Sequence, residues 1–329
     1  MEKILTISIA AYNVGNYIKN TLDSLIVPEI MDRLEVFIVD DGGTDETLRI
    51  AREYEEKYPE TFHAVHKENG GYGSTVNYSI AHATGKYFKL LDGDDWFCKE
   101  NLKEYIHFLE KQEVDIVLSP YFRVFTETEK MVYIERNSDI QKVNFIKDVC
   151  VENIPIMHEM CVKTYLLQKS NKKITEHCFY TDYEFVFLSL LKASTIVYFS
   201  LPIYCYQIGV EGQSVSVEGI RKHYLDKSKV AFQLYNWYNE NGKDVYQGFH
   251  KKILIQEMLG ITDDAYTAYM TLINTKKGKE ELKKFDKKIK EQFDNIYQIT
   301  MLIKKVKLLR KTKFIAFHYL RKRYLKSFL

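Results

Sequence analysis

Residues 87–96 read Tyr-Phe-Lys-Leu-Leu-Asp-Gly-Asp-Asp-Trp, an apolar run that ends in a cluster of carboxylates. Residues 36–41, Val-Phe-Ile-Val-Asp-Asp, repeat this arrangement earlier in the chain. Carboxylates at the carboxyl ends of neighbouring parallel strands point into one crevice, where open α/β sheets bind ligands. Like charges gathered in a cleft are costly unless a cation neutralises them, and Mg²⁺ and Mn²⁺ prefer oxygen ligands. The sequence therefore predicts a metal–nucleotide site near the N-terminus.

The N-terminal third of the chain alternates between short apolar runs and segments with helical spacing. Strands are expected at 5–10, 34–39, 62–66 and 86–91, and helices at 17–26, 44–58 and 70–83. Thr44 is expected to cap the second of these helices. This β-α-β-α-β-α-β order predicts an α/β fold with a mostly parallel, doubly wound sheet.

Further along, the pattern becomes mixed. It predicts a helix at 99–111, a strand at 115–119, a hairpin at 121–136, a helix at 182–193, a strand at 195–206 and helices after residue 223. Residues 186–204 are the nearest approach to a membrane span, but Lys192 and several hydroxyl residues interrupt them. We therefore expect a helix followed by a strand there.

Composition favours an ordinary globular protein. The chain has 329 residues, of which 46% are hydrophobic, and a net charge of +2. Its five cysteines, Cys150 among them, are widely spaced and form no zinc or CxxC pattern, so reduced thiols are expected. The N-terminus lacks the features of a signal peptide. These observations predict a cytoplasmic protein.

The net charge hides an asymmetry between the C-terminal tail and the rest of the chain. Leu302–Leu329 contains ten Lys/Arg and no acidic residue, which leaves the remainder at about −8. Apolar and aromatic residues alternate with these charges. The tail therefore predicts either peripheral contact with the anionic inner face of a membrane or a homo-oligomer contact. Nucleic acid is not expected as a partner, because the body is acidic and no nucleic-acid-binding signature is present.

Four motifs occur in order: Ser-Ile-Ala-Ala-Tyr-Asn at 8–13, Val-Asp-Asp-Gly-Gly-Thr-Asp at 39–45, Asn-Gly-Gly at 69–71 and Asp-Gly-Asp-Asp at 92–95. Together they resemble the nucleotide-binding half of family 2 glycosyltransferases of the GT-A fold. The resemblance covers residues 4–120 well and 150–216 more loosely. It implies a GT-A, Rossmann-like catalytic domain at 1–222, with a nucleotide-binding half at 1–120 and an acceptor half at 121–222. A C-terminal helical region would follow at 223–329.

The resemblance also assigns roles to residues around the donor. Ala10 and Tyr12 would frame the uracil of a UDP-sugar, and Asp40 or Asp41 would accept a charge-assisted hydrogen bond from its N3–H. Asp92 would face the ribose, and Asp94 and Asp95 would hold Mn²⁺ or Mg²⁺. The other residues expected to contact the nucleotide are Asn69, Gly70, Asn77 and Gly93. An EF-hand does not fit residues 92–95, because its required Gly and distant Glu are missing.

Residues 180–185, Tyr-Thr-Asp-Tyr-Glu-Phe, resemble the helix start that carries the family's general base. Members usually have Glu-Asp there, whereas this chain has Thr-Asp, so the Asp is retained as Asp182. Inverting transfer needs a carboxylate that removes the proton of the attacking acceptor hydroxyl. Two alternatives remain open: Asp182 only caps its helix, or Glu184 is the base.

The acceptor side is less well marked. Trp96, His158 and Glu159 are the expected acceptor residues, although Trp96 and His158 also suit structural roles. The segment 204–216, which includes Gly212, resembles a later part of the family that covers the diphosphate. Gln207 stands where members often have Arg, which leaves a direct cationic phosphate contact in doubt.

These features together predict a metal-dependent, inverting hexosyltransferase. It would move a sugar from a UDP-sugar to a glycan or glycoprotein acceptor, as in the synthesis of cell-surface polysaccharide. Two other classes stay open. A nucleotidyltransferase would usually carry a Gly-rich basic loop between residues 5 and 18, which is absent. A non-catalytic sugar-nucleotide-binding or scaffold subunit would not need the acidic cluster together with Asp182.

Overall fold

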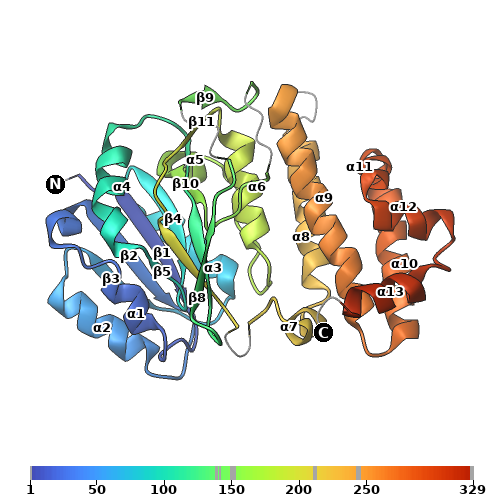
Figure 1. Ribbon diagram of the computed structural model, residues 1–329, viewed down its shortest axis with the longest axis horizontal. Helices are drawn as coiled ribbons and strands as arrows, with labels where there is room; N and C mark the ends of the chain where they lie inside the picture. Colours follow the sequence, from blue (N-terminus) through green and yellow to red (C-terminus); the bar gives the residue numbers. More distant parts are fainter. Residues whose placement is uncertain are drawn as a thin grey trace. The chain divides into compact units, whose positions relative to one another are not determined.

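The computed structural model describes residues 2–137, 140, 142–148, 153–209, 213–241 and 246–326 (Figure 1). Cys150, Gly212 and the last three residues of the basic tail lie outside these ranges. Internal contacts divide the chain into two compact units, Met1–Val210 with Gly248–His250, and Glu211–Gln247 with Lys251–Leu329. The expected domain boundary after residue 222 remains a prediction.

The first unit is built on an eight-stranded sheet with the order β3-β2-β1-β4-β10-β6-β11-β9. Strands β3, β2, β1 and β4 are parallel to one another, so the predicted doubly wound half is confirmed. Beyond β4 the sheet becomes mixed, because β10 runs antiparallel to both β4 and β6. The bounds are β1 Leu5–Ala11, β2 Leu34–Asp40, β3 Phe62–His66, β4 Tyr87–Asp92, β6 Ile116–Leu118, β9 Asn144–Phe145, β10 Met160–Lys163 and β11 Thr195–Tyr198.

Helices cover this sheet, and burial shows that both faces are enclosed. Successive residues of β1 and β2 are buried on either side of the pleat, as in sheets packed between two helical layers. Asp40 and Asp92 close β2 and β4 at the same carboxyl edge, which positions both acidic clusters. The helices of this unit are α1 Ile18–Asp23, the 3-10 helix η1 Pro28–Arg33, α2 Thr47–Lys57, α3 Tyr72–His82, α4 Lys99–Lys111, α5 Thr164–Gln168 and α6 Asp182–Lys192.

The expected cap at Thr44 is wrong. Helix α2 begins at Thr47, whose backbone N–H donates to Asp45 Oδ1 (3.0 Å). Thr44 is held outside the helix, because its own N–H donates to Asn13 Oδ1 (2.9 Å). A carboxylate near the N-terminus of the helix therefore replaces the predicted hydroxyl.

The single strand expected at 195–206 is also wrong. The chain forms β11 in the main sheet and then β12 (Tyr204–Ile208) in a second sheet. Pro202 lies between them, and proline has no N–H to extend a ladder. The second sheet has the order β5-β12-β7-β8, with β5 Trp96–Phe97, β7 Tyr121–Phe125 and β8 Lys130–Ile134. β7 and β8 form the predicted hairpin.

The second unit is helical in its described part, as predicted for the chain after residue 223. Its elements are α7 Val217–Lys222, α8 Asp226–Glu240, α9 Gly248–Thr271, α10 Thr275–Gln292, α11 Asp294–Ile299, η2 Thr300–Leu302, α12 Lys304–Lys311 and α13 Phe317–Leu325. Buried apolar side chains such as Leu234, Ile261 and Leu282 form its core. Among the described residues, no helix is both long and apolar enough for a membrane crossing.

Candidate active site

The first acidic pair is satisfied by groups of the protein itself. Asp41 Oδ1 accepts hydrogen bonds from Lys67 Nζ (2.8 Å) and Gly70 N (2.9 Å), and its Oδ2 accepts one from Gly71 N (2.7 Å). The hydroxyl of Ser74 adds a further donor at 3.2 Å. The carboxylate of Asp41 thus ties the end of β2 to the start of α3.

Its neighbour Asp40 is bound in the same way. Asp40 Oδ1 accepts from Gly43 N (3.2 Å), and Oδ2 pairs with His66 Nδ1 (2.6 Å). Asn69 donates from its amide to the Asp41 carbonyl (2.8 Å). Close by in the chain, Ala10 lies near the end of β1 and Tyr12 is exposed. The expected contacts of these residues with uracil remain predictions.

The second acidic cluster is different. Asp92, Asp95 and His158 each present a ligand atom, and these three atoms lie within 4.8 Å of one another. Asp92 Oδ1 and His158 Nδ1 are buried and find no hydrogen-bond partner in the described part of the chain. Carboxylate oxygen and imidazole nitrogen are ligands for first-row divalent cations such as Mn²⁺. The group therefore has the composition and spacing of a cation site.

The pKa values of these side chains also indicate that the cluster lacks positive charge. Burial, together with the charge of Asp94, raises the pKa of Asp92 to about 7. Burial and the neighbouring carboxylates also raise the pKa of Asp95. The pKa of His158 falls to about 3 through burial and the nearby cations Lys89, Arg123 and Arg136, so the imidazole is neutral. A bound cation would relieve the repulsion among these carboxylates.

The group differs from the metal ligands expected from the sequence. Asp95 belongs to it, Asp94 lies close enough for its charge to act on Asp92, and the metal role of both residues remains a prediction. Asp92, expected at the ribose, and His158, expected at the acceptor, complete the cluster. Gly93 packs closely, since an added Cβ would come within 2.9 Å of Val14 Cγ2.

A tyrosine from a distant segment, Tyr204, holds the cluster, and the sequence analysis gave it no role of its own. Tyr204 accepts a hydrogen bond from Asp92 N (3.1 Å) and donates to Asp95 Oδ2 (2.6 Å). Asp95 Oδ1 accepts from the backbone N–H of Gln207 (2.7 Å), so the residue that replaces the family's Arg still contacts the site. Tyr72, whose hydroxyl donates to Met157 Sδ (3.4 Å), lies close enough to Asp92 to oppose the rise in the pKa of that carboxyl. In the sequence, the signal in this region was the resemblance of segment 204–216 to the part of the family that covers the diphosphate.

His158 reaches the carboxylates because of a buried lysine. Lys89, in the middle of β4, donates to the backbone carbonyls of His158 (2.9 Å) and Met160 (3.0 Å). Rings of Tyr206 and Tyr204 pack against the imidazole, with centroids 4.4 and 4.7 Å away. Glu159, by contrast, turns its Oε2 toward Ile156 N (3.1 Å) inside the protein. Its expected contact with an acceptor remains a prediction.

Asp182 is the first residue of α6 and lies near the cluster. Its charge contributes to the raised pKa values of both Asp92 and Tyr72. Thr181, not Asp182, occupies the N-cap position, and Tyr180 before it has a left-handed backbone (φ 65°). Strained residues of this kind persist where the surrounding structure holds them, often at functional sites.

Glu184 faces a different environment. Its Oε2 accepts a hydrogen bond from Thr175 N (2.7 Å), and burial raises the pKa of this carboxyl to about 7. The side chain is fully enclosed. This arrangement suits a carboxyl that fixes the preceding loop better than one that meets a substrate.

The loop that precedes α6 is held by the glycine-rich start of α3. His177 N donates to the Gly70 carbonyl (2.5 Å), and an added Cβ on Gly73 would lie 2.2 Å from the Thr175 carbonyl oxygen. Asn77 exchanges hydrogen bonds with both the N–H and the carbonyl of Ile174, at 2.9 Å each. The amide of Asn77 is thus engaged with this loop, and its contact with a nucleotide stays a prediction.

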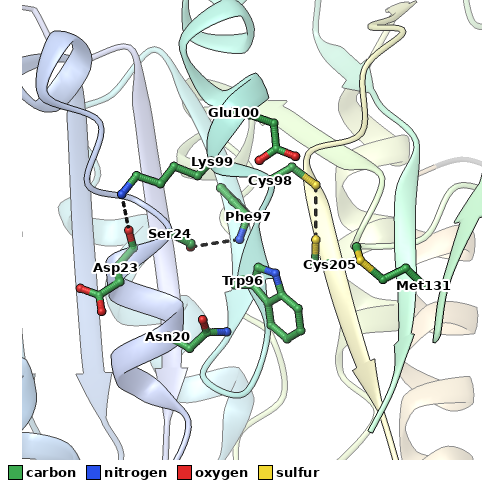
Figure 2. Close-up of a pocket in the computed structure, with 10 residues that line it drawn as sticks. All are labelled: Asn20, Asp23, Ser24, Trp96, Phe97, Cys98, Lys99, Glu100, Met131 and Cys205. Carbon is green, nitrogen blue, oxygen red and sulfur yellow. Dashed lines mark hydrogen bonds between the residues drawn. The ribbon is translucent and has the colours of Figure 1, made fainter. Parts of the chain in front are cut away.

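Trp96 is separated from the carboxylates. It pairs with Cys205 across β5 and β12, and side chains alternate along a strand. Since Tyr204 points to Asp95, Cys205 and Trp96 point to the opposite face. There Trp96 lines an open pocket of about 360 Å³, with Met131 and Asn20 at its edges (Figure 2). Its expected contact with an acceptor sugar remains a prediction.

Comparisons with known proteins show the family to which the chain belongs. The family model described as "Glycosyl transferase family 2" matches residues 6–175. The putative glycosyltransferase EpsH of Bacillus subtilis is 28% identical over 217 residues, which cover 62% of this chain and 60% of EpsH. The minor teichoic acid biosynthesis protein GgaB of the same organism is 33% identical over 114 residues, covering 34% of this chain and 13% of GgaB. The chain therefore spans less than two thirds of either relative.

Solved structures extend the likeness to the whole chain. The crystal structure of S. aureus TarS 1-349 in complex with UDP-GlcNAc has a TM-score of 0.69 at 18% identity, covering 98% of this chain and 92% of that one. The mannosyltransferase PcManGT from Pyrobaculum calidifontis, in complex with GDP-Man and Mn²⁺, has a TM-score of 0.51 at 17% identity, covering 82% and 74%. Such likeness establishes the fold, and the expected GT-A architecture with a C-terminal helical region is confirmed.

Proposed function

Because this chain belongs to glycosyl transferase family 2, we propose that it is an inverting, metal-dependent transferase that uses a UDP-sugar donor. The acceptor is a hydroxyl group of a glycan or glycoconjugate. The observation that carries the proposal is the group of Asp92, Asp95 and His158, with two buried acceptor atoms that no described donor satisfies. A cation on a sugar diphosphate would supply the missing positive charge.

The residues of the group fit Mn²⁺ or Mg²⁺. Two carboxylates and a neutral imidazole suit Mn²⁺ well, while Mg²⁺ would depend more on oxygen ligands, Asp94 among them. Such a cation, when bound, stabilises negative charge on the departing diphosphate. Tyr204 and the Gln207 N–H orient Asp95 for this task through their hydrogen bonds.

Asp182 is the proposed general base. It stands at the start of α6, close enough for its charge to act on Asp92. In an inverting reaction the acceptor hydroxyl forms a bond to C1 of the sugar as the bond from C1 to the diphosphate oxygen breaks. Asp182 would accept the hydroxyl proton in that step, and UDP would leave with the electron pair of the broken bond.

The donor and the acceptor are proposed from the similar proteins. TarS has been solved with UDP-GlcNAc and with UDP, which supports a uridine donor, although PcManGT was solved with GDP-Man. The name of GgaB supports a cell-surface polymer as acceptor. A cytoplasmic location belongs to the same proposal. It is supported by the free thiols of Cys98, Cys161, Cys178 and Cys205.

Calorimetry and kinetics of matched variants test the proposal. UDP should bind well with Mn²⁺ and weakly with EDTA. Asp182→Asn should keep the UDP affinity of the parent and lower turnover about a hundredfold or more, the usual scale for loss of a general base. Glu184→Gln is the control and should keep most of its turnover. Equal UDP affinity with Mn²⁺ and EDTA would remove the metal, and loss of turnover only in Glu184→Gln would move the base by two residues.

A further inference from the structure

The end of the second unit carries an exposed surface that the proposed reaction does not use. We call it the basic C-terminal surface. Four of its members are apolar: Leu302 (71% exposed), Leu308, Ile315 (77%) and Tyr319 (63%). Its cationic members, all exposed, are Lys304, Lys307, Lys311, Lys313, Lys322, Arg323 and Lys326.

Helix α12 separates its two faces cleanly. Val306 and Leu309 are buried and anchor the helix. At 3.6 residues per turn, Lys304, Lys307, Leu308 and Lys311 fall together on the side opposite these anchors. All four are exposed. The outward stripe of α12 therefore combines three cations with a leucine.

Helix α13 repeats the arrangement. Phe317 is its buried anchor. Tyr319, Lys322, Arg323 and Lys326 are exposed and share the opposite side. Ile315, in the turn that joins the two helices, is more exposed than any other large apolar residue of the described chain. Aromatic and aliphatic groups thus accompany the cations along the whole segment.

The basic residues that anchor these helices are different from the exposed cations of this surface. Lys305 pairs with Asp263 (3.0 Å) and Arg310 with Asp286 (2.7 Å), and Arg321 donates to the Leu272 carbonyl (3.1 Å). Those three basic residues anchor the helices. Within the described part of the chain, no ion pair joins the seven exposed cations to an acidic group.

Helix α10 shows what an ordinary solvated face looks like in the same unit. Its eight lysines are accompanied by three glutamates and an aspartate, and Lys284 pairs with Glu281 (2.7 Å) while Lys287 pairs with Glu291 (3.4 Å). Residues 302–329 contain no acidic residue at all. The basic C-terminal surface therefore differs from α10 in two ways: it contains no acidic residue, and exposed apolar side chains lie among its cations.

We propose that the basic C-terminal surface binds the surface of an anionic lipid bilayer. Unpaired lysines favour any polyanion, but Leu302, Ile315 and Tyr319 gain nothing from a polyanion in water. At a bilayer interface these side chains enter the boundary between headgroups and acyl chains while the cations meet anionic headgroups. Only a lipid surface satisfies both halves of the pattern at once.

Vesicle binding of the full-length protein tests this. Vesicles of phosphatidylcholine with about one third phosphatidylglycerol should sediment the protein at low salt, and pure phosphatidylcholine should not. A triple variant should weaken vesicle binding on the order of 100-fold, since each basic residue near an anionic surface raises the affinity about fivefold. It combines Lys304→Gln, Lys307→Gln and Lys311→Gln. The matched control neutralises Lys276, Lys284 and Lys287 of α10, and should bind as the parent does.

The apolar half needs its own variants. Ile315→Ser with Tyr319→Ser should weaken binding about tenfold or more, as expected when buried apolar area is removed from an interfacial segment. The control is Phe145→Ser. Phe145 is an exposed aromatic residue of β9, and its replacement should not change vesicle binding. Thermal melts of all variants check that they are folded.

Three results would overturn the proposal. The first is equal weakening by the α10 control, which would reduce binding to net charge. The second is tight binding of soluble polyphosphate, with the same affinity in the parent and in the Ile315→Ser, Tyr319→Ser double variant. That result would make the surface a polyanion site. The third is absence of vesicle binding together with a protein dimer that these apolar substitutions dissociate, which would make it an oligomer contact.

Discussion

Two acidic clusters follow two parallel strands of one sheet, and they meet opposite conditions. At the end of β2, Asp41 receives hydrogen bonds from two backbone N–H groups, a lysine and a serine. At the end of β4, Asp92 keeps a buried oxygen without a donor, and its pKa rises to about 7. In the sequence the two look alike, because each is an apolar run that ends in aspartates.

The difference suggests a criterion that distinguishes buried carboxylates that stabilise the fold from buried carboxylates that bind a ligand. A carboxylate whose oxygens all receive donors is already neutralised by the protein and stabilises the fold. A buried carboxylate that lies close to other carboxylates, and has an oxygen without a hydrogen-bond donor, is stabilised when a ligand supplies positive charge. By this criterion we propose the β4 cluster as the cation site, and the β2 pair as a structural tie that can also border a ligand.

The largest effect should come from the β4 cluster. Asp92→Asn should lower glycosyl transfer by about ten-thousandfold, or ~5 kcal/mol, because it removes a ligand that holds charge on the leaving diphosphate. The metal-free variant should melt no lower than the parent, since a repelled buried charge is removed. Saturating Mn²⁺, at about 100 times its dissociation constant, should stabilise the parent by ~2.7 kcal/mol and leave the variant unchanged. A variant that unfolds easily without metal would break the comparison.

The β2 pair should respond in the opposite sense. Asp41→Ala should lower the free energy of unfolding by about 4 kcal/mol, because it leaves the N–H groups of Gly70 and Gly71 without their acceptor and removes the carboxylate that pairs with the Lys67 ammonium. Chemical denaturation measures this loss. Lys67→Met is the control for the ion pair alone and should cost less. An Asp41→Ala protein as stable as the parent would show that the pair is not a structural tie.

Glu184 tests whether an unpartnered oxygen is enough to mark a ligand site. Its pKa is about 7 in the fold, above its ordinary value, so the folded protein holds a proton that the unfolded chain has lost. Stability should therefore be full below about pH 4.5 and fall as pH rises toward 7, by about 3 kcal/mol in total. Glu184→Gln cannot titrate and should lose this share of the slope, while Asp92, whose pKa also rises to about 7, keeps its own. Melting curves of the parent and of Glu184→Gln from pH 4.5 to 8, without divalent ions and with Mn²⁺, measure the difference between the two slopes. A difference that Mn²⁺ abolishes would make Glu184 part of the cation site.

The parallel half of the fold could be predicted because its signals are local. Each strand, turn and helix from β1 to β4 lies within a short stretch with its own period and turn residues. The second sheet could not be predicted in the same way. Residues 195–206 read as one β-rich run in which Pro202 is the local sign of a break, and the tertiary pairing of β12 with β5 and β7 places the second part in another sheet.

The sequence likewise predicted the carboxylates of the candidate site but not the side chains that contact them. These carboxylates follow strands and could be found from the sequence, but their partners are more than sixty positions away in sequence. Lys89 brings in His158 through β10, and the division of β11 from β12 brings in Tyr204. A tyrosine or a histidine in an apolar run has no local mark that distinguishes it from a core residue. Only the fold places these side chains beside Asp92 and Asp95.

The glycine-rich start of α3 has a consequence for genetics. Gly73 leaves no room for a side chain against the Thr175 carbonyl, and Thr175 belongs to the loop that leads into Asp182. A single methyl group there would displace the loop without altering any residue that meets a substrate. A screen for inactive alleles should therefore recover Gly73→Ala as a lesion that acts at a distance, and second-site suppressors should map to residues 174–178.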